Sequence, residues 1–579
     1  MNRQVISRRG KTRRGISLFY FAPFSLHVSN FMSRTALMRL IRRAYQLSRA
    51  SAQMQIPAAE LAEMQQLASR RQVLQGLTAG VIGLGTQSMQ PHKSGQIASQ
   101  LQPQIRPQIS DTGIARDNLL VVGAGIAGLT AAYRLRQAGV GVDLVEASHR
   151  VGGRLVSLTQ MAGEFSTVEL GGEFIDSRHQ AVRALAAELG LELADLQAAD
   201  EGLEREILYF DGQRMNEGRV VEEFAELAHR IDQDLKQLTS RDITYRDPSP
   251  DAIRLDRLSL ADYLDAAAIS PLINKLVRVA YITEFGRDPD SQSCLNMLFL
   301  IGAEVGKWSA YGVSDERYHV VGGNDQLPKK LAERLLGVIE FGTRLESIRA
   351  TSDNRYRVSL RQDNKSLERI YDRILLTLPF SLLRQVDLGL ELPEVKRTAI
   401  DDLGYGMSSK LAVPYRERIW RTQYGCTISI YTDLDFQNTW ESARYGTGPG
   451  GWVTDLRGGS QGLQLAEATP QIQAAHLTQD LEQIFPGIAQ VPRGKAMRAI
   501  WATEPYALGS YSCYLPGQWT SLGGAEIERV GNLWFAGEHC SLGSQGYMNG
   551  ACETAEVAAK SILANLGAKP LGARPVIQT

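Results

Sequence analysis

The sequence predicts an α/β protein of two domains, one built on a parallel β-sheet and the other of mixed helices and strands. Three observations predict this class. The chain has 579 residues, 44% of them hydrophobic, and this length favours two or three domains of about 150 residues each. An apolar strand-like run leads directly into a glycine-rich turn and a helical run, which is typical of α/β units. Farther along, helical runs and glycine-punctuated β-type runs follow one another.

The composition excludes several functional classes. Lys+Arg and Asp+Glu number 63 each, and this balance argues against nucleic acid as the main partner. The five cysteines contain no CxxC pair, so neither a disulfide framework nor a metal site is predicted. No run of 18 or more residues is free of polar interruption, so no membrane-spanning helix is predicted, while peripheral membrane contact stays open.

The chain begins with a basic extension, residues 1–67, which we do not assign to the fold. Its first 59 residues contain eleven Lys and Arg and no acidic residue, a pattern typical of targeting or translated upstream sequence. The arginine pair of an export signal normally lies near the start of a chain. Because the pair Arg70-Arg71 lies far from Met1, Met54 or Met64 is a candidate for the true start of the precursor.

Residues 68–90 resemble a twin-arginine export signal. Arg70 and Arg71 precede a weakly hydrophobic segment, as in such signals, so we expect export to a periplasm or lumen. The alternative is a chance arginine pair ahead of a surface helix. Residues 91–117, rich in Gln, Pro and Ser, are predicted to form a linker.

The first motif with chemical meaning follows the linker. Residues 118–122 form an apolar β-type run that ends in a GxGxxG turn. Gly123 allows the tight turn, Gly125 lets backbone approach a pyrophosphate, and Gly128 lets the helix pack on the strand. Glu146 ends a second strand 18 residues after Gly128, where a carboxylate can accept both hydroxyls of an adenosine ribose. These features predict a dinucleotide site. The alternative is a structural glycine turn with a surface glutamate.

A second glycine pair indicates which dinucleotide binds. Gly152 and Gly153 are flanked by Arg150 and Arg154, directly after the ribose carboxylate. Further phosphate or ring contacts at this position are typical of bound FAD and are not required by a dissociable nicotinamide.

From here the sequence resembles the flavin-containing amine oxidase family, over roughly Asn118 to Leu566. The resemblance is carried by Glu169–Ile175, Val320–Leu327, Asp372–Pro379, Asn532–Glu538 and Gly546–Ala551, in that order. It implies a Rossmann-type FAD-binding domain made of residues 118–190, 316–400 and 501–566. It also implies a substrate domain, helical over 191–315 and of sheet and helix over 401–500, with a tail at 567–579.

The motifs and the resemblance together assign seventeen residues to the cofactor. They are Gly123, Gly125, Ala127, Gly128, Glu146, Arg150, Gly152, Gly153, Arg154, Gly171, Gly172, Glu173, Pro379, Gly537, Glu538, Tyr547 and Met548.

The resemblance also implies the chemistry, in which the flavin accepts the electrons and the protein supplies a dry slot for an amine. Tyr511 and Tyr547 match the two aromatic walls of that slot, as substrate-binding and catalytic residues. A core-packing role for Tyr511 is the alternative. Lys410 matches the lysine that holds a water at flavin N5 in many relatives, and the alternative for it is an exposed strand lysine.

Three residues depart from particular subfamilies. Ser510 stands where monoamine oxidases carry the flavin-linked cysteine, which predicts noncovalent FAD. Glu173 stands near the arginine position of venom L-amino-acid oxidases, where a carboxylate favours a cationic substrate tail. The alternative is that Glu173 pairs with Arg154 or a backbone amide. Arg178 is the nearest other arginine for a substrate carboxylate. Asn549 replaces the glutamate of many relatives, and no role for it follows from the sequence.

The remaining segments are predicted to form the substrate domain. Helical periodicity marks Val220–Leu238, Leu258–Glu284 and Ile472–Ile484, while Trp420–Trp452 contains β-type runs. Glu284 and Asp288 are candidate charges at the entrance.

Together these observations predict an FAD-dependent amine oxidoreductase. A basic L-amino acid or a polyamine is favoured as substrate, because of Glu173. Hydride transfer to flavin N5 would give an imine that hydrolyses to a carbonyl compound, and oxygen or a quinone would reoxidise the flavin. The alternatives are a flavin-dependent desaturase of an apolar polyene and a flavin-binding protein without turnover.

Overall fold

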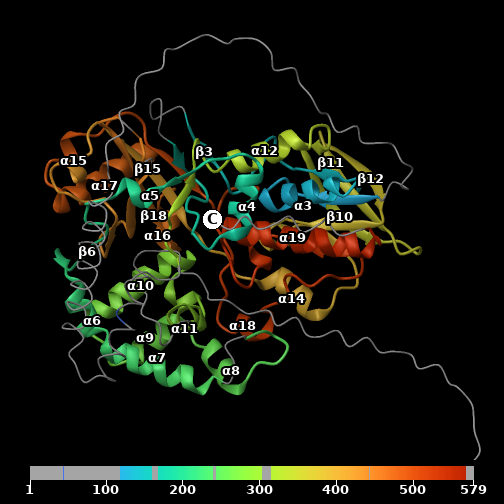
Figure 1. Cartoon of the computed structure of the whole chain (residues 1–579). Helices are drawn as coiled ribbons and strands as arrows, with labels where there is room; N and C mark the ends of the chain where they lie inside the picture. Colours follow the sequence, from blue (N-terminus) through green and yellow to red (C-terminus); the bar gives the residue numbers. More distant parts are fainter. Residues whose placement is uncertain are drawn as a thin grey trace, which may run out of the picture.

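The computed structural model describes residues 44, 118–159, 167–238, 243–302, 314–442, 444–446 and 448–568. The expected Arg70-Arg71 signal and linker, and the basic extension apart from Ala44, lie outside the described residues. Figure 1 shows the helices α6 to α11 gathered in one lobe beneath a large sheet, with the domain that contains α3 and α19 beside them.

A five-stranded parallel sheet forms the centre of the first domain. Its order is β20-β13-β1-β2-β9, and every neighbouring pair is parallel. The strands are β1 (Leu119–Val122), β2 (Asp143–Val145), β9 (Ile339–Glu340), β13 (Arg373–Leu376) and β20 (Leu533–Phe535). They come from three separate stretches of sequence, and a fully buried β1 lies in the middle.

The glycine turn after β1 depends on one very close approach. A Cβ on Gly128 would lie 1.9 Å from the carbonyl oxygen of Gly123. Only glycine therefore lets α3 (Ile126–Gln137) begin against the end of β1, which confirms the predicted packing role of Gly128. Gly123 itself has φ +105°, in the region that glycine alone adopts readily. α19 (Met548–Asn565) packs alongside α3.

A second sheet extends this domain. Its order is β12-β11-β10-β14, with β10 (Thr343–Ala350), β11 (Tyr356–Gln362), β12 (Lys365–Tyr371) and β14 (Asp387–Gly389). Asp363 and Asn364 connect β11 to β12, with φ of +46° and +63°. Two consecutive residues of positive φ give the tight hairpin that matches the twist of paired strands.

The substrate side is built on a seven-stranded sheet of order β19-β15-β18-β17-β16-β6-β7. Its strands are β6 (Ile207–Phe210), β7 (Gln213–Met215), β15 (Ser409–Tyr415), β16 (Ile430–Thr432), β17 (Asn438–Ser442), β18 (Gly451–Arg457) and β19 (Met497–Ile500). β6 pairs in parallel with β16, and all other neighbours are antiparallel. The β6–β7 hairpin thus joins this sheet from a segment that the sequence analysis treated as helical.

Two of the expected helices are each divided in two. Val220–Leu238 is covered by α6 (Glu217–Glu223) and α7 (Ala225–Gln237), which meet at the buried Phe224. Leu258–Glu284 is covered by α9 (Leu260–Asp265) and α10 (Pro271–Phe285), because Ser270 caps the backbone N–H of Ile273 and Pro271 starts a new helix. α17 (Pro470–Ile484) contains the third expected helix.

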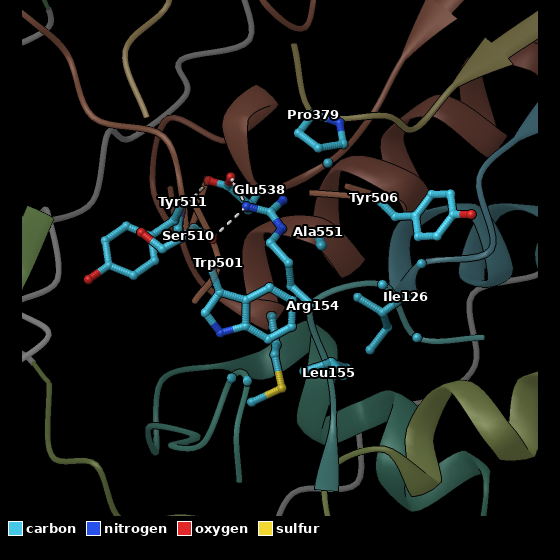
Figure 2. Close-up of a pocket in the computed structure, with 18 of the residues that line it drawn as sticks. Ile126, Arg154, Leu155, Pro379, Trp501, Tyr506, Ser510, Tyr511, Glu538 and Ala551 are labelled. Carbon is cyan, nitrogen blue, oxygen red and sulfur yellow. Dashed lines mark hydrogen bonds and ion pairs between the residues drawn. The ribbon is translucent and has the colours of Figure 1, made fainter. Parts of the chain in front are cut away.

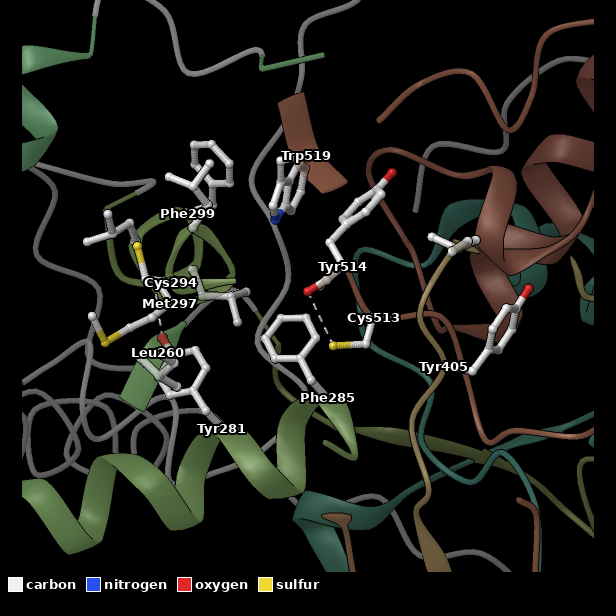
Figure 3. Packing of buried hydrophobic residues seen from close by; sticks show 14 of the residues in the cluster. Leu260, Tyr281, Phe285, Cys294, Met297, Phe299, Tyr405, Cys513, Tyr514 and Trp519 are labelled. Carbon is white, nitrogen blue, oxygen red and sulfur yellow. Dashed lines mark hydrogen bonds between the residues drawn. The ribbon is translucent and has the colours of Figure 1, made fainter. Parts of the chain in front are cut away.

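The helical lobe contains a dense aromatic cluster. Figure 3 shows Phe299 of α11 (Cys294–Gly302) beside Trp519 of α18 (Gln518–Ser521), with Phe285 of α10 in the same cluster. The rings of Phe299 and Trp519 lie 4.9 Å apart at the centroids, and the Trp519 indole N–H donates to Asn296. α18 belongs to the last stretch of the chain, so this cluster joins the two domains.

The other elements are short or peripheral. The helices are α4 (Gln180–Glu188), α5 (Leu196–Ala199), α8 (Pro250–Asp256), α12 (Gln326–Arg334), α13 (Phe380–Leu383), α14 (Glu394–Asp402), α15 (Ile419–Thr422), α16 (Gly459–Gln464), η1 (Pro289–Ser291), η2 (Ile488–Gln490) and η3 (Glu538–Cys540). The strands are β3 (Ser157–Leu158), β4 (Val168–Glu169), β5 (Leu193–Asp195) and β8 (Tyr318–Val320). Within the described ranges, no helix is both long and apolar enough to cross a membrane.

Candidate functional site

A cavity of about 1080 Å³ lies between the carboxyl ends of the parallel strands and the seven-stranded sheet. Val122 and Val145 line it where β1 and β2 end, and Lys410 of β15 and Trp440 of β17 line the opposite side. The carboxyl edge of a parallel sheet is where such folds bind nucleotides. Ligand pockets commonly measure roughly 300 to 1,000 Å³, so this one has room for a large cofactor together with a small molecule.

Sixteen of the seventeen residues expected at the cofactor line this cavity. They are Gly123, Gly125, Ala127, Glu146, Arg150, Gly152, Gly153, Arg154, Gly171, Gly172, Glu173, Pro379, Gly537, Glu538, Tyr547 and Met548. Gly128 is the exception, because its place is the contact between α3 and β1. The sequence analysis was wrong to count it among the direct contacts.

The glycine turn and Glu146 fit a dinucleotide. A Cβ on Gly125 would meet nothing within 4 Å, so the backbone here faces open space, and no side chain caps the amides at the start of α3. Helix N-termini of this kind bind phosphate. The Glu146 carboxylate is fixed at the end of β2 by the backbone N–H groups of Ala124 and Ser148, at 2.8 and 2.9 Å.

An ion pair between Arg154 and Glu538 connects the second glycine pair to the C-terminal segments (Figure 2). Arg154 donates to Glu538 Oε1 and to the carbonyl oxygen of Ser510, both at 2.8 Å. Glu538 also accepts from the Ser512 hydroxyl at 2.7 Å and from the Gly546 N–H at 2.8 Å. Burial opposes ionisation of Glu538, but the charge of Arg154 and these hydrogen bonds lower its pKa below the ordinary value. The carboxylate therefore stays ionised.

Both expected wall residues line the cavity. Tyr511 donates to the carbonyl oxygen of Thr283 at 3.2 Å and accepts from the Ser408 hydroxyl at 2.9 Å. Tyr547 precedes α19, and its ring lies 4.9 Å from that of His179. Tyr511 is therefore part of the site and not of a core. Figure 2 also shows Trp501 beside Arg154. It lines the cavity too, and the sequence analysis missed it, although it opens the loop that contains Tyr511.

Glu173 has a different partner from either of those considered. Its Oε2 lies 2.7 Å from Lys410 Nζ, and its Oε1 accepts from the Trp440 indole N–H at 2.9 Å. Lys410 also donates to the carbonyl oxygens of Gly171 and Glu169, at 2.8 and 3.2 Å. Glu173 is thus already neutralised, which corrects the expectation that it attracts a cationic substrate tail.

Lys410 is 7% exposed and faces the cavity, so it is not an exposed strand lysine. An ammonium group has three donors, and all three have acceptors within the protein. Holding a water at the flavin, as the resemblance implies, would require one of these hydrogen bonds to be released.

Besides this ion pair, the lining includes a set of mostly polar residues that forms a polar chamber. We use this name for the lining residues Phe174, Gln197, Asp200, Arg205, Glu206, Thr283, Asp315, Glu316, Ser429, Asn438, Thr439, Trp440 and Arg444. Both signs of charge occur in it. The sequence analysis gave none of these residues a role in binding a substrate. Most of them lie on short strands and loops with no motif, whereas Phe174 belongs to the Glu169–Ile175 segment and Thr283 to α10.

Comparison with known proteins identifies the family. The model of the flavin containing amine oxidoreductases matches residues 126–563, which is most of the chain. The chain belongs to this family. FAD is accordingly the cofactor of this flavin-containing amine oxidoreductase, and the residues that line the cavity fit it.

The relatives are distant but similar in extent. Flavin-containing amine oxidase A of Sus scrofa is 24% identical over 469 residues, which cover 78% of this chain and 85% of the relative. An L-amino acid dehydrogenase of Synechocystis is 24% identical over 478 residues, covering 77% and 94%.

Solved structures confirm the predicted two-domain α/β fold. Cyclohexylamine oxidase of Brevibacterium oxydans superimposes with a TM-score of 0.66 at 22% identity, covering 78% of this chain and all of that one. Putrescine oxidase bound to putrescine gives 0.65 at 20% identity, covering 77% and 99%.

Three charges that the sequence analysis placed near the substrate lie elsewhere in this oxidoreductase. Glu284 is fully buried at the end of α10 and Asp288 accepts from the Ser460 N–H, so neither lines the cavity. Arg178 is exposed and also outside the lining. The hydrophobic periodicity of the sequence identifies a helical segment, but it does not show where the charged side chains at the end of the helix point.

The structure gives Asn549 a role that the sequence did not. Its side-chain oxygen accepts from the backbone N–H groups of Ala181 and Val182, at 3.0 and 3.2 Å. These are amides of the first turn of α4, so Asn549 caps that helix from α19. His179 directly precedes α4, and the cap therefore also fixes the residue that contacts Tyr547.

A buried acid behind Tyr547 leads to a pH prediction. Burial, with the nearby charge of Glu316, raises the pKa of Asp176 to about 7, while burial lowers the pKa of His179 to about 3. The folded protein therefore keeps a proton on Asp176 that the unfolded chain loses near pH 4, and this contribution to stability is lost as pH rises to about 7.

Replacing Asp176 with asparagine should remove this loss. The free energy of unfolding of D176N minus that of the parent should therefore be larger at pH 8 than at pH 5, by a few kcal/mol. Urea unfolding of the FAD-free proteins at both pH values measures the difference, in which the His179 contribution cancels. A difference independent of pH would show that Asp176 does not titrate in this range.

Proposed function

We propose that this oxidoreductase oxidises the C–N bond of a polar, charged amine, with a basic L-amino acid or a polyamine as the substrate class. The observation that carries the proposal is the polar chamber. An apolar ligand there would take the half-buried carboxylates of Glu206, Asp315 and Glu316 out of water without offering them hydrogen bonds, which is costly. The chamber therefore disfavours the desaturase alternative.

The preference for a cationic amine rests on the more exposed charged residues of the chamber. Glu206, Asp315 and Glu316 are half-buried, and Arg205 is exposed. Three acids against one base among these residues give an excess of negative charge, which attracts cations and raises their local concentration. These acids replace Glu173 as the basis for the preference.

The chain's own side chains position the amine and exclude water. Tyr511 and Tyr547 flank the substrate, and Glu173 and Lys410 form an ion pair without net charge in the cavity wall. FAD, when bound, would accept a hydride from the α C–H bond of the amine, while the amine nitrogen loses a proton. The resulting imine is hydrolysed by water to a carbonyl compound and ammonia or a smaller amine.

We also propose that the FAD is held without a covalent bond. Ser510 precedes the wall tyrosine, and no cysteine occurs among the described residues that line the cavity. All five cysteines are buried elsewhere. Acid precipitation should therefore release all flavin into the supernatant, and flavin that stays with the precipitate would show a covalent bond.

Export through a twin-arginine route is likewise proposed, on the strength of Arg70 and Arg71. Such a route carries folded, cofactor-loaded proteins, which suits a protein that must bind FAD before use. The mass of the mature N-terminus tests this. Cleavage shortly after residue 90 is expected, and an N-terminus upstream of Arg70 in the exported fraction would contradict it.

Product analysis tests the proposed reaction. FAD-loaded protein is incubated with L-arginine, L-lysine, putrescine or spermidine, with oxygen or a soluble quinone as acceptor, and ammonia and the carbonyl product are measured. L-Norleucine and cyclohexylamine are matched controls that lack a second cationic group. Turnover of the four test compounds well above that of the controls is expected. Equal or faster turnover of the controls would contradict the substrate class.

A further inference from the structure

We propose that Arg444 recognises a carboxylate on the substrate and so selects amino acids over amines that lack this group. The inference rests on the proposed function and narrows its substrate class. It follows from the donors that Arg444 leaves open, from the charge balance around it, and from its place in the polar chamber.

The guanidinium of Arg444 is held by two of its three nitrogens. Nη1 donates to Asp200 Oδ2 at 2.8 Å, and Nε donates to the carbonyl oxygen of Glu441 at 3.1 Å. For Nη2, the described part of the chain supplies no acceptor, and the atom is not sealed from solvent. Arg444 lines the cavity with a side chain that is 13% exposed. A fixed guanidinium therefore presents two open N–H donors at the cavity.

The charge around Arg444 is unbalanced. Arg418 and Arg421 pair with Glu441 at 3.1 and 2.5 Å, while Arg421 and Arg444 pair with Asp200 at 2.7 and 2.8 Å. We call these five residues the arginine cluster. The arginine side chains are at most 15% exposed and the acids at most 4%. Three cations thus share two anions in a largely buried place, where unpaired charge is costly. An anion bound at Nη2 would neutralise the surplus.

An aromatic bridge connects the arginine cluster to the rest of the site. The Arg444 guanidinium lies 5.5 Å from the ring centroid of Phe174, and that ring lies 5.4 Å from Trp440. Trp440 in turn donates to Glu173, and Lys410 Nζ lies 5.1 Å from its ring. A carboxylate at Arg444 and an amine beside the Glu173–Lys410 pair would therefore share one chamber.

The test compares L-arginine with agmatine, which differ only by the α-carboxylate. Arg444→Met removes the donors but keeps an unbranched side chain that reaches about as far as Nε of the arginine. Arg421→Met is the matched control, because Arg421 belongs to the same cluster, also contacts Asp200, and does not line the cavity. Arg444→Lys keeps the charge without the forked donors, and remains usable if the methionine variant folds poorly.

In R444M we expect kcat/KM for L-arginine to fall about 10- to 100-fold, as for the loss of a hydrogen bond to a charged group. The loss should lie mainly in KM, and agmatine should change by less than about twofold. R421M should leave the ratio of the two substrates unchanged, and R444K should recover part of the loss. L-Glutamate and L-glutamine, compared in the same way, show whether Arg444 binds a side-chain carboxylate instead of the α-carboxylate.

Anaerobic calorimetric titration of the protein with its FAD already reduced, using L-arginine and agmatine, repeats the comparison without turnover. Equal losses for both compounds in R444M would overturn the inference while leaving the proposed function intact. If the parent protein oxidises no amine, the proposed function fails, and the titration still decides whether Arg444 binds a carboxylate.

Discussion

Replacing Gly128 with alanine is expected to destabilise the FAD-free protein by about 3 kcal/mol or more, at or above the upper end of the usual cost of overpacking. The new Cβ would lie 1.9 Å from the carbonyl oxygen of Gly123 and 2.8 Å from the Thr377 hydroxyl. The first neighbour is backbone at the end of a buried central strand, so it cannot move aside cheaply. Urea unfolding of the FAD-free protein measures the loss.

Gly125→Ala is the matched control, and its expected effect is of another kind. Its Cβ would meet no atom within 4 Å, and its φ of −69° suits any residue. The FAD-free protein should keep its stability to within about 1 kcal/mol. FAD affinity, measured by flavin titration, should fall at least about tenfold, because the methyl group enters the cavity where backbone approaches the cofactor. If both variants lose stability alike, the two glycines do not have the separate roles described here.

The ion pair between Glu173 and Lys410 should give the second large effect. Glu173→Gln leaves a buried ammonium without a counter-charge, and Lys410→Met leaves a buried carboxylate that accepts, among the described residues, only from Trp440 and Ser442. Removing one partner of a buried pair costs about 3 to 5 kcal/mol. The double variant leaves no unpaired charge and should recover most of the loss.

A double-mutant cycle measures this coupling. The free energy of unfolding of the parent, the two single variants and the double variant is determined under one set of conditions. A coupling of several kcal/mol is expected for side chains that are 9% and 7% exposed. If the two single effects simply add, Glu173 and Lys410 stabilise the fold independently, and the cavity wall does not depend on their pairing.

Local sequence was enough to predict the FAD half of the site. The tight turn at Gly123, the close packing at Gly128 and the carboxylate at Glu146 are each required by contacts within one βαβ unit. The wall tyrosines could be placed because Tyr511 and Tyr547 lie in segments whose order matches the family. For each of these residues, the neighbouring residues in the sequence were enough to indicate a function.

The substrate half could not be predicted in the same way. Glu173 and Lys410 are 237 positions apart, and only the packing of β15 against the Gly171–Gly172 segment makes them partners. Arg444 acquires its importance from Asp200, 244 positions away. The β6–β7 hairpin is stabilised by pairing with β16, and this pairing leaves no mark in the periodicity of either segment. Long-range partners therefore decide the parts that the sequence analysis missed or misassigned.

The most direct test of the central claim is anaerobic mixing of the FAD-loaded protein with L-arginine, L-lysine, putrescine, spermidine and an aromatic monoamine in turn. It needs no knowledge of the electron acceptor. We expect the visible absorption band of oxidised flavin to disappear with at least one of the charged compounds and to persist with the aromatic monoamine. A band that persists with every amine would contradict amine oxidation at this site.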